Sequence, residues 1–214
     1  MKIVMDFTGT SGTGKTTIMN DLKPIILNDN YFCKIVESSS RYFMESHNLK
    51  LYDKMEDPDS GLMGFANIAS ILQSIRLSDY TLCTDLAIRG LVYASYSKKI
   101  SKELINCYRY MVEFLNSSLF RAEIYPIWIY LPLEISKKEY DIEGKNEHRG
   151  RISYEEQKKI CKITEYTLES FKLPYYKLIG DREARLESMY ELYQKTTWIL
   201  KKGKSYNPGG YLLT

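Results

Sequence analysis

The sequence predicts an α/β fold in which a central parallel sheet of about five strands lies between two layers of helices. Short β-rich runs alternate with segments that are long enough for helices, and this alternation is typical of parallel sheets. The first run also leads through a glycine-rich turn into helical spacing of apolar residues, which is the order strand, loop, helix. The predicted strands are residues 2–7, 31–37, 80–85, 126–131 and 174–179.

The glycine-rich turn matches the phosphate-binding pattern G-x-x-x-x-G-K-[ST] from Gly9 to Thr16. Glycines let successive backbone N–H groups wrap a phosphate, Lys15 supplies a cation for the β- and γ-phosphates, and the Thr16 hydroxyl can ligate Mg²⁺. We expect Lys15 to be exposed, so that packing does not depend on it. A glycine-rich turn without a ligand is the alternative. The expected ATP-binding residues are Gly9, Thr10, Ser11, Gly12, Thr13, Gly14, Lys15, Thr16 and Thr17.

Together with the alternation of strands and helices, the motif predicts the three-layer α/β/α sandwich of P-loop NTPases. Ser101, Ser153 and Asp181 each precede glutamates, which places caps and negative charge at the positive end of a helix dipole. Residues 56–61, which read Glu-Asp-Pro-Asp-Ser-Gly, are expected to form a surface loop. The predicted helices are residues 16–27, 39–47, 62–79, 101–118, 154–172 and 182–202.

Length and composition indicate a single domain over residues 1–214, with a C-terminal tail at about 203–214 that either folds back or forms a flexible end. The net charge of +3 is far below that of a dedicated nucleic-acid module. The four cysteines form no C-x-x-C pair, so neither a disulfide framework nor a zinc site is expected. No apolar run has the length of a signal peptide or membrane span, so we expect a cytoplasmic protein without a membrane partner.

Two carboxylates end predicted strands, at the edge where ligands bind in parallel α/β sheets. Glu37 and Asp85 can each hold Mg²⁺ or its waters, or take the proton of an attacking hydroxyl. Capping of the following helix is the alternative role for each. Arg41 and Arg89 follow four residues later, a spacing that suits either an anionic acceptor or a surface ion pair.

Residues 143–151, which read Glu-Gly-Lys-Asn-Glu-His-Arg-Gly-Arg, are polar throughout and predict an arginine-containing lid at about residues 140–152. Arginines that a closing lid brings in can stabilise negative charge on a transferring phosphoryl group. Arg149 and Arg151 fit that task, and a solvated charged loop is the alternative.

The predicted helix at residues 62–79 presents two polar side chains beside its apolar face. Gln73 and Arg76 lie three residues apart, so they share one side of the helix. They either contact the acceptor or face solvent. The expected acceptor-binding residues are Glu37, Arg41, Gln73, Arg76 and Arg89.

This order of features resembles the small P-loop kinases of the nucleoside and nucleotide kinase class. The shared pattern consists of the phosphate loop, the Glu37-Ser-Ser-Ser-Arg41 run, Asp85 before a helix with arginine and tyrosine, an arginine-rich lid and a late strand. It is most similar to the ribosylnicotinamide-kinase-like and phage-type deoxynucleotide kinases, over roughly residues 1–180.

The resemblance implies that Glu37 faces the acceptor, that Asp85 serves the metal or the acceptor, and that Arg149 and Arg151 are lid arginines. Such kinases often carry arginine directly after the aspartate. Here Leu-Ala-Ile intervenes before Arg89, so the role of this arginine stays open.

The sequence therefore predicts an ATP- and Mg²⁺-dependent kinase that phosphorylates a nucleoside, nucleotide or related small acceptor. Lys15, Glu37, Asp85, Arg149 and Arg151 are its expected catalytic residues, and Thr16 and Asp85 its expected metal ligands. One alternative is a kinase that acts on nucleic acid, at a 5′-hydroxyl end or a hydroxymethylated base. Another is an ATP-binding switch without transfer activity. The oligomeric state stays open, with a homodimer among the options.

Overall fold

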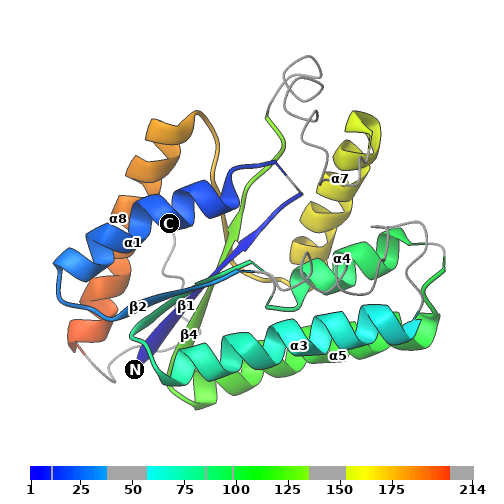
Figure 1. The fold of residues 1–214 in the computed structure, drawn as a ribbon, viewed down its shortest axis with the longest axis horizontal. Helices are drawn as coiled ribbons and strands as arrows, with labels where there is room; N and C mark the ends of the chain where they lie inside the picture. Colours follow the sequence, from blue (N-terminus) through cyan, green and yellow to red (C-terminus); the bar gives the residue numbers. More distant parts are fainter. Residues whose placement is uncertain (11, 38–56, 85, 98, 135–152, 203–214) are drawn as a thin grey trace.

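The computed structural model describes residues 1–10, 12–37, 57–84, 86–97, 99–134 and 153–202 (Figure 1). Five strands form one sheet in the order β2-β3-β1-β4-β5, and every neighbouring pair is parallel. All five predicted strands are confirmed. Their bounds are Lys2–Thr8 for β1, Cys33–Val36 for β2, Tyr80–Cys83 for β3, Ile124–Tyr130 for β4 and Tyr175–Lys177 for β5.

Six helices in the described part of the chain cover the two faces of this sheet, which confirms the three-layer sandwich. Helices α1 and α8 pack on one face, and α3, α4, α5 and α7 lie on the other (Figure 1). Their bounds are Lys15–Asn28 for α1, Asp57–Arg76 for α3, Ile88–Tyr96 for α4, Lys102–Arg121 for α5, Tyr154–Ser170 for α7 and Arg182–Lys202 for α8.

The central strand β1 supplies both cores because its side chains alternate between the two faces. Ile3, Met5 and Phe7 belong to the cluster under α1 and α8, whereas Val4 belongs to the cluster under the other four helices. Both faces of β1 are therefore buried, which explains its nearly continuous apolar sequence.

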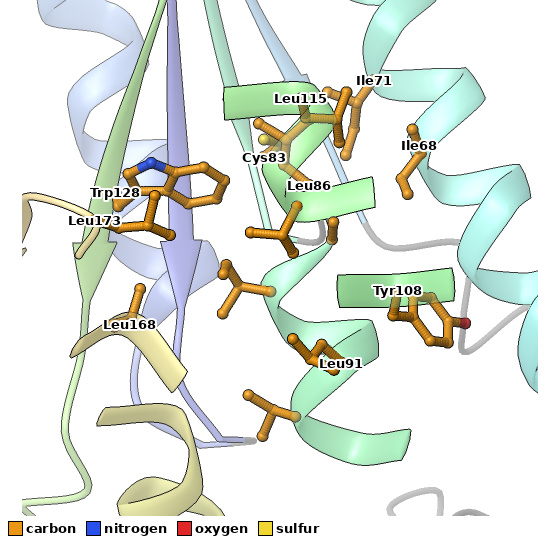
Figure 2. Packing of buried hydrophobic residues seen from close by; sticks show 14 of the residues in the cluster. Ile68, Ile71, Cys83, Leu86, Leu91, Tyr108, Leu115, Trp128, Leu168 and Leu173 are labelled. Atoms are coloured by element: carbon orange, nitrogen blue, oxygen red, sulfur yellow. The ribbon is translucent and has the colours of Figure 1, made fainter. Parts of the chain in front are cut away.

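The larger core contains Trp128 of β4 and Cys83 of β3 against side chains from the helices of that face (Figure 2). Leu86, which precedes α4, and Leu91 of α4 belong to this core, and Tyr108 of α5 packs in it beside α3. The described residues that follow β3 are thus anchored in the core of this face, next to the sheet edge where ligands bind.

The predicted surface loop at residues 56–61 is wrong, because the first turn of α3 begins at Asp57. Tyr108 of α5 donates a hydrogen bond of 2.6 Å to the Ser60 carbonyl in this turn. Gly61 lies directly against Leu104, where an added Cβ would already be in van der Waals contact at 3.6 Å. Packing on α5 therefore outweighs the local preference of these residues for a turn.

Several predicted features lie outside the described residues: the helix at 39–47, the lid at about 140–152 and the tail at about 203–214. Among the helices that are described, none is long and apolar enough to cross a membrane.

Candidate phosphate-binding site

The glycine-rich turn directly follows the central strand β1 at the carboxyl edge of the sheet. Gly9, Gly12 and Gly14 all have positive φ angles, of 147°, 80° and 84°. A Cβ on Gly9 would lie 2.5 Å from the Leu131 carbonyl oxygen, so the close approach of β1 and β4 also requires glycine there. The motif's glycines are therefore needed for the path of the backbone itself.

Lys15 lies across this loop and contacts its backbone. Its Nζ donates to the Gly9 carbonyl at 2.9 Å, to the Thr10 carbonyl, and to the Thr13 hydroxyl at 3.4 Å. The side chain is buried, with 8% of the residue exposed, so the expectation of an exposed lysine is wrong. The loop is compact enough that its own carbonyl oxygens surround the ammonium group.

Helix α1 begins at Lys15, and its N-cap residue, Gly14, makes no side-chain capping hydrogen bond. The first turn contains no acidic residue, and Thr16 and Thr17 are exposed in it. No carboxylate of this turn therefore neutralises the N-terminal N–H groups or the positive end of the helix dipole. Both favour binding of an anion at the start of α1.

An arginine from the other end of the chain contacts the outside of the loop. Arg185 of α8 donates from Nη1 to the Thr13 carbonyl at 2.7 Å and from Nη2 to Glu134 Oε2 at 2.7 Å. The same carboxylate oxygen accepts from the Gly180 N–H at 2.8 Å. Arg185 and Glu134 therefore join the phosphate loop to the segments that follow β4 and β5.

Helix α7 meets the loop on its other side. The Thr10 hydroxyl and the Cys161 thiol are 3.8 Å apart, and the Tyr130 hydroxyl donates to the Cys161 carbonyl at 3.3 Å. Burial raises the pKa of Tyr130, so this hydroxyl stays protonated and remains a donor at neutral pH. The loop is thus held between α7 and α8.

A buried carboxylate lies next to the loop, within β1. Asp6 is 1% exposed, and its Oδ1 accepts from the Leu86 N–H at 3.3 Å and from the Cys83 thiol at 3.6 Å. Ala87, the next residue, has φ 124° and precedes α4 as its N-cap. A positive φ is strained for alanine, so Asp6 contacts a backbone turn that local preference alone would not form.

Glu37 follows β2 directly and is exposed at the carboxyl edge of the sheet. Since β2 is separated from β1 only by β3, Glu37 lies about two strand spacings, roughly 10 Å, from the loop that follows β1. Asp85 lies outside the described residues, two positions after the last residue of β3 in the sequence. The topology therefore brings the end of β2, the end of β3 and the phosphate loop to one edge.

Arg89 lies in the first turn of α4, half-buried, with its Cζ 5.3 Å from the centre of the Tyr93 ring. This position is at the same edge of the sheet as the phosphate loop, because α4 begins shortly after β3 ends. The other predicted residues Ser11, Arg41, Arg149 and Arg151 lie outside the described part of the chain.

Gln73 and Arg76 are not brought to the phosphate loop. The Lys2 ammonium donates to the Arg76 carbonyl at 2.6 Å, which places the end of α3 beside the first residue of β1. The loop follows the last residue of this seven-residue strand, about 20 Å away at the usual rise per residue. Both side chains are exposed, which agrees with the alternative prediction that they face solvent.

Within the described residues, no group of three or more histidine, cysteine, aspartate or glutamate side chains could hold a metal ion. The exposed oxygen ligands that the described residues offer here include the Thr16 hydroxyl and the Glu37 carboxylate. Such a sparse set of oxygens fits Mg²⁺, which keeps several waters and binds proteins through few ligands together with substrate phosphates.

Three residues of this site were not identified from the sequence: Asp6, Glu134 and Arg185. Asp6 left one signal, a carboxylate inside an otherwise apolar strand. The sequence contains no signal for Arg185 or Glu134, because an arginine in a helix and a glutamate in a loop are common. Only the fold brings Arg185, and with it Glu134, to Thr13.

No family model and no curated protein matches the sequence. Solved structures match the fold. The NadR protein in complex with NR has a TM-score of 0.63 at 19% identity, over 92% of this chain and 51% of that chain. Deoxyadenosine kinase from M. mycoides with the products dCMP and dCDP has a TM-score of 0.59 at 16% identity, over 92% of this chain and 100% of that chain. The YorR protein from Bacillus subtilis, in complex with phosphorylated GDP, has a TM-score of 0.58 at 13% identity, over 93% of this chain and 99% of that chain.

The chain therefore has the fold of P-loop nucleoside and nucleotide kinases, as the sequence predicts. It spans about half the length of the NadR chain and the whole length of the deoxyadenosine kinase chain.

Proposed function

We propose that the protein is an ATP-dependent kinase that transfers the γ-phosphoryl group to a hydroxyl of a nucleoside, nucleotide or related small acceptor. The observation that carries this proposal is the phosphate loop, in which three glycines with positive φ and a buried lysine lie at the start of an uncapped helix. Backbone N–H groups, a cation and a helix dipole at one point are what a polyphosphate needs.

In the proposed reaction, the acceptor hydroxyl oxygen forms a bond to the γ-phosphorus, and the bond from this phosphorus to the β–γ bridging oxygen breaks. The hydroxyl proton passes to a carboxylate, for which Glu37 and Asp85 are the candidates. ADP leaves with the electron pair of the broken bond. Lys15 neutralises charge on the β- and γ-phosphates once they replace loop carbonyls as partners of its ammonium.

Mg²⁺ would be held by the Thr16 hydroxyl and Asp85, and when bound it would neutralise charge on the β- and γ-oxygens. Arg149 and Arg151 would add positive charge next to the transferring group and exclude water. Arg41 and Arg89 would contact the acceptor from the segments after β2 and β3, together with Glu37.

A small acceptor is favoured over nucleic acid. The similar solved structures hold small compounds, namely NR, deoxynucleotides and a phosphorylated GDP. The net charge of +3 also provides only a weak electrostatic attraction for a polyanion.

The decisive experiment is phosphate transfer from γ-³²P-labelled ATP with Mg²⁺ to separate pools of nucleosides, mononucleotides and oligonucleotides. Label in a nucleoside or mononucleotide is the expected result. Label only in oligonucleotides would identify a nucleic-acid kinase instead. Tight ATP binding without label in any pool would identify an ATP-binding switch, and both of these results would contradict the proposal.

A further inference from the structure

The orientation of one peptide group in the phosphate loop depends on a residue far away in the sequence. The Thr13 carbonyl accepts from Arg185 Nη1 at 2.7 Å. In a planar trans peptide, the C=O of one residue and the N–H of the next point in opposite directions. The Gly14 N–H therefore points away from Arg185.

Local sequence does not determine this orientation. Rotating the Thr13–Gly14 peptide changes the ψ angle of Thr13 and the φ angle of Gly14, and glycine adopts positive and negative φ with similar ease. The observed φ of 84° at Gly14 is thus one of two accessible choices. Arg185 supplies a contact from outside the loop that favours the observed orientation.

Arg185 is itself held in one position. Only 11% of its side chain is exposed, and Glu134 Oε2, which lies 2.7 Å from Nη2, is in turn fixed by the Gly180 N–H at 2.8 Å. The guanidinium also lies against Gly14, where an added Cβ would be 3.7 Å from Nη1. A carboxylate and a neighbouring backbone group therefore aim one Arg185 donor at the loop.

We propose that Arg185, oriented by Glu134, is a positioning residue of the phosphate loop: it holds the Thr13–Gly14 peptide so that the Gly14 N–H faces the bound phosphates. This inference rests on the proposed function only in that the loop binds polyphosphate. It assigns Arg185 no contact with the substrate.

The test compares Arg185→Met with Arg185→Lys and with the control Arg182→Met. Arg182 lies on the same helix and pairs with Asp21 of α1 at 2.8 and 2.6 Å, without a described contact to the loop. The double variant Arg185→Met/Glu134→Gln avoids an unpaired carboxylate if the single variant folds poorly. Calorimetry measures binding of ATP, inorganic triphosphate and adenosine.

We expect Arg185→Met and the double variant to weaken ATP and triphosphate binding about tenfold or more. These variants lose the hydrogen bond that orients the Thr13–Gly14 peptide, whose N–H group would bind phosphate. Adenosine binding should stay unchanged, Arg185→Lys should recover part of the loss, and Arg182→Met should match the wild type. Crystal structures of the variants should show the Thr13–Gly14 peptide rotated or in two orientations.

Unchanged triphosphate affinity in both Arg185→Met variants, or an equal loss in Arg182→Met, would overturn the inference. So would an unaltered peptide orientation in the variant crystals. A wild-type protein that binds triphosphate but phosphorylates no acceptor would contradict the proposed kinase and leave this inference standing.

Discussion

The carboxylate of Asp6 in β1 accepts a hydrogen bond from the backbone N–H of Leu86, 80 residues later, at 3.3 Å. It joins the strand that leads into the phosphate loop to the turn that follows β3. Both groups are buried, and Ala87 next to them has a positive φ. The contact thus links the two segments on which the proposed chemistry depends.

Removing this acceptor should destabilise the protein and lower its activity. We expect Asp6→Ala to reduce the free energy of unfolding by about 1–3 kcal/mol, because it leaves the buried Leu86 N–H without this acceptor. Asp6→Asn keeps an acceptor oxygen and should lose less. Urea unfolding of both variants checks this, and equal stability of Asp6→Ala and wild type would show that the contact contributes nothing.

Replacing Lys15 should affect both function and stability. Lys15→Met keeps the aliphatic stem but removes the ammonium, so we expect kcat to fall by about 100-fold or more. The buried carbonyls of Gly9 and Thr10 also lose a donor, which should cost about 1–3 kcal/mol of unfolding free energy. The exposed Lys195 provides the control, Lys195→Met. Normal turnover in Lys15→Met would contradict the kinase proposal.

The carboxylates that follow β2 and β3 should be needed for turnover. We expect Glu37→Gln and Asp85→Asn each to lower kcat by about 100-fold, since a general base or a metal-positioning carboxylate contributes on that order. Steady-state kinetics at saturating Mg²⁺ measure it, with the exposed Glu113→Gln of α5 as the control. If both variants turn over normally, these residues only cap helices.

The predicted lid arginines should act on the reaction more than on donor binding. We expect Arg149→Ala and Arg151→Ala to lower kcat strongly while the Kd of ATP changes little, because their charge would meet negative charge that develops during transfer. Comparing kcat with a directly measured Kd separates the two effects. Equal losses in affinity and kcat/KM with unchanged kcat would assign these arginines to ATP binding instead.

The start of α7 should give a pH-dependent contribution to stability. Glu156 Oε2 accepts from the Ser153 hydroxyl at 2.7 Å and from the Ser153 N–H at 2.9 Å, and Oε1 accepts from the Tyr96 hydroxyl at 3.1 Å. These hydrogen bonds, led by those from Ser153, lower the pKa of Glu156 from 4.5. A lowered pKa in the folded state stabilises the protein above the unfolded-state pKa, and this stabilisation disappears as the pH falls through the folded-state pKa.

We therefore expect Glu156→Gln to be less stable than wild type at pH 7 by about 0.5–1 kcal/mol, with the difference shrinking below about pH 4.5. Urea unfolding across this range measures it. Glu155→Gln, exposed in the same helical turn, controls for the helix dipole. A difference that stays constant from pH 7 to pH 3 would show that the charge of Glu156 is not responsible.

Several features could be predicted from the sequence because they depend on residues close together in the chain. The phosphate loop is one, since glycines at positions 9, 12 and 14 permit the backbone path and Lys15 follows directly. The five strands are another, because short β-rich runs alternate with longer segments of helical spacing. The capping box at Ser153 and Glu156 is also local.

The tertiary structure decided what depends on residues far apart. Residues 57–61 form a helical turn because Tyr108 of α5 packs on it. Arg76 lies at the amino edge of the sheet because α3 runs back toward the start of β1. Arg185 reaches Thr13 only because α8 packs beside α1, 172 positions away in the chain. Local propensity specifies a backbone conformation and a motif, whereas the direction of a helix and the partner of a side chain follow from packing the whole chain around one sheet.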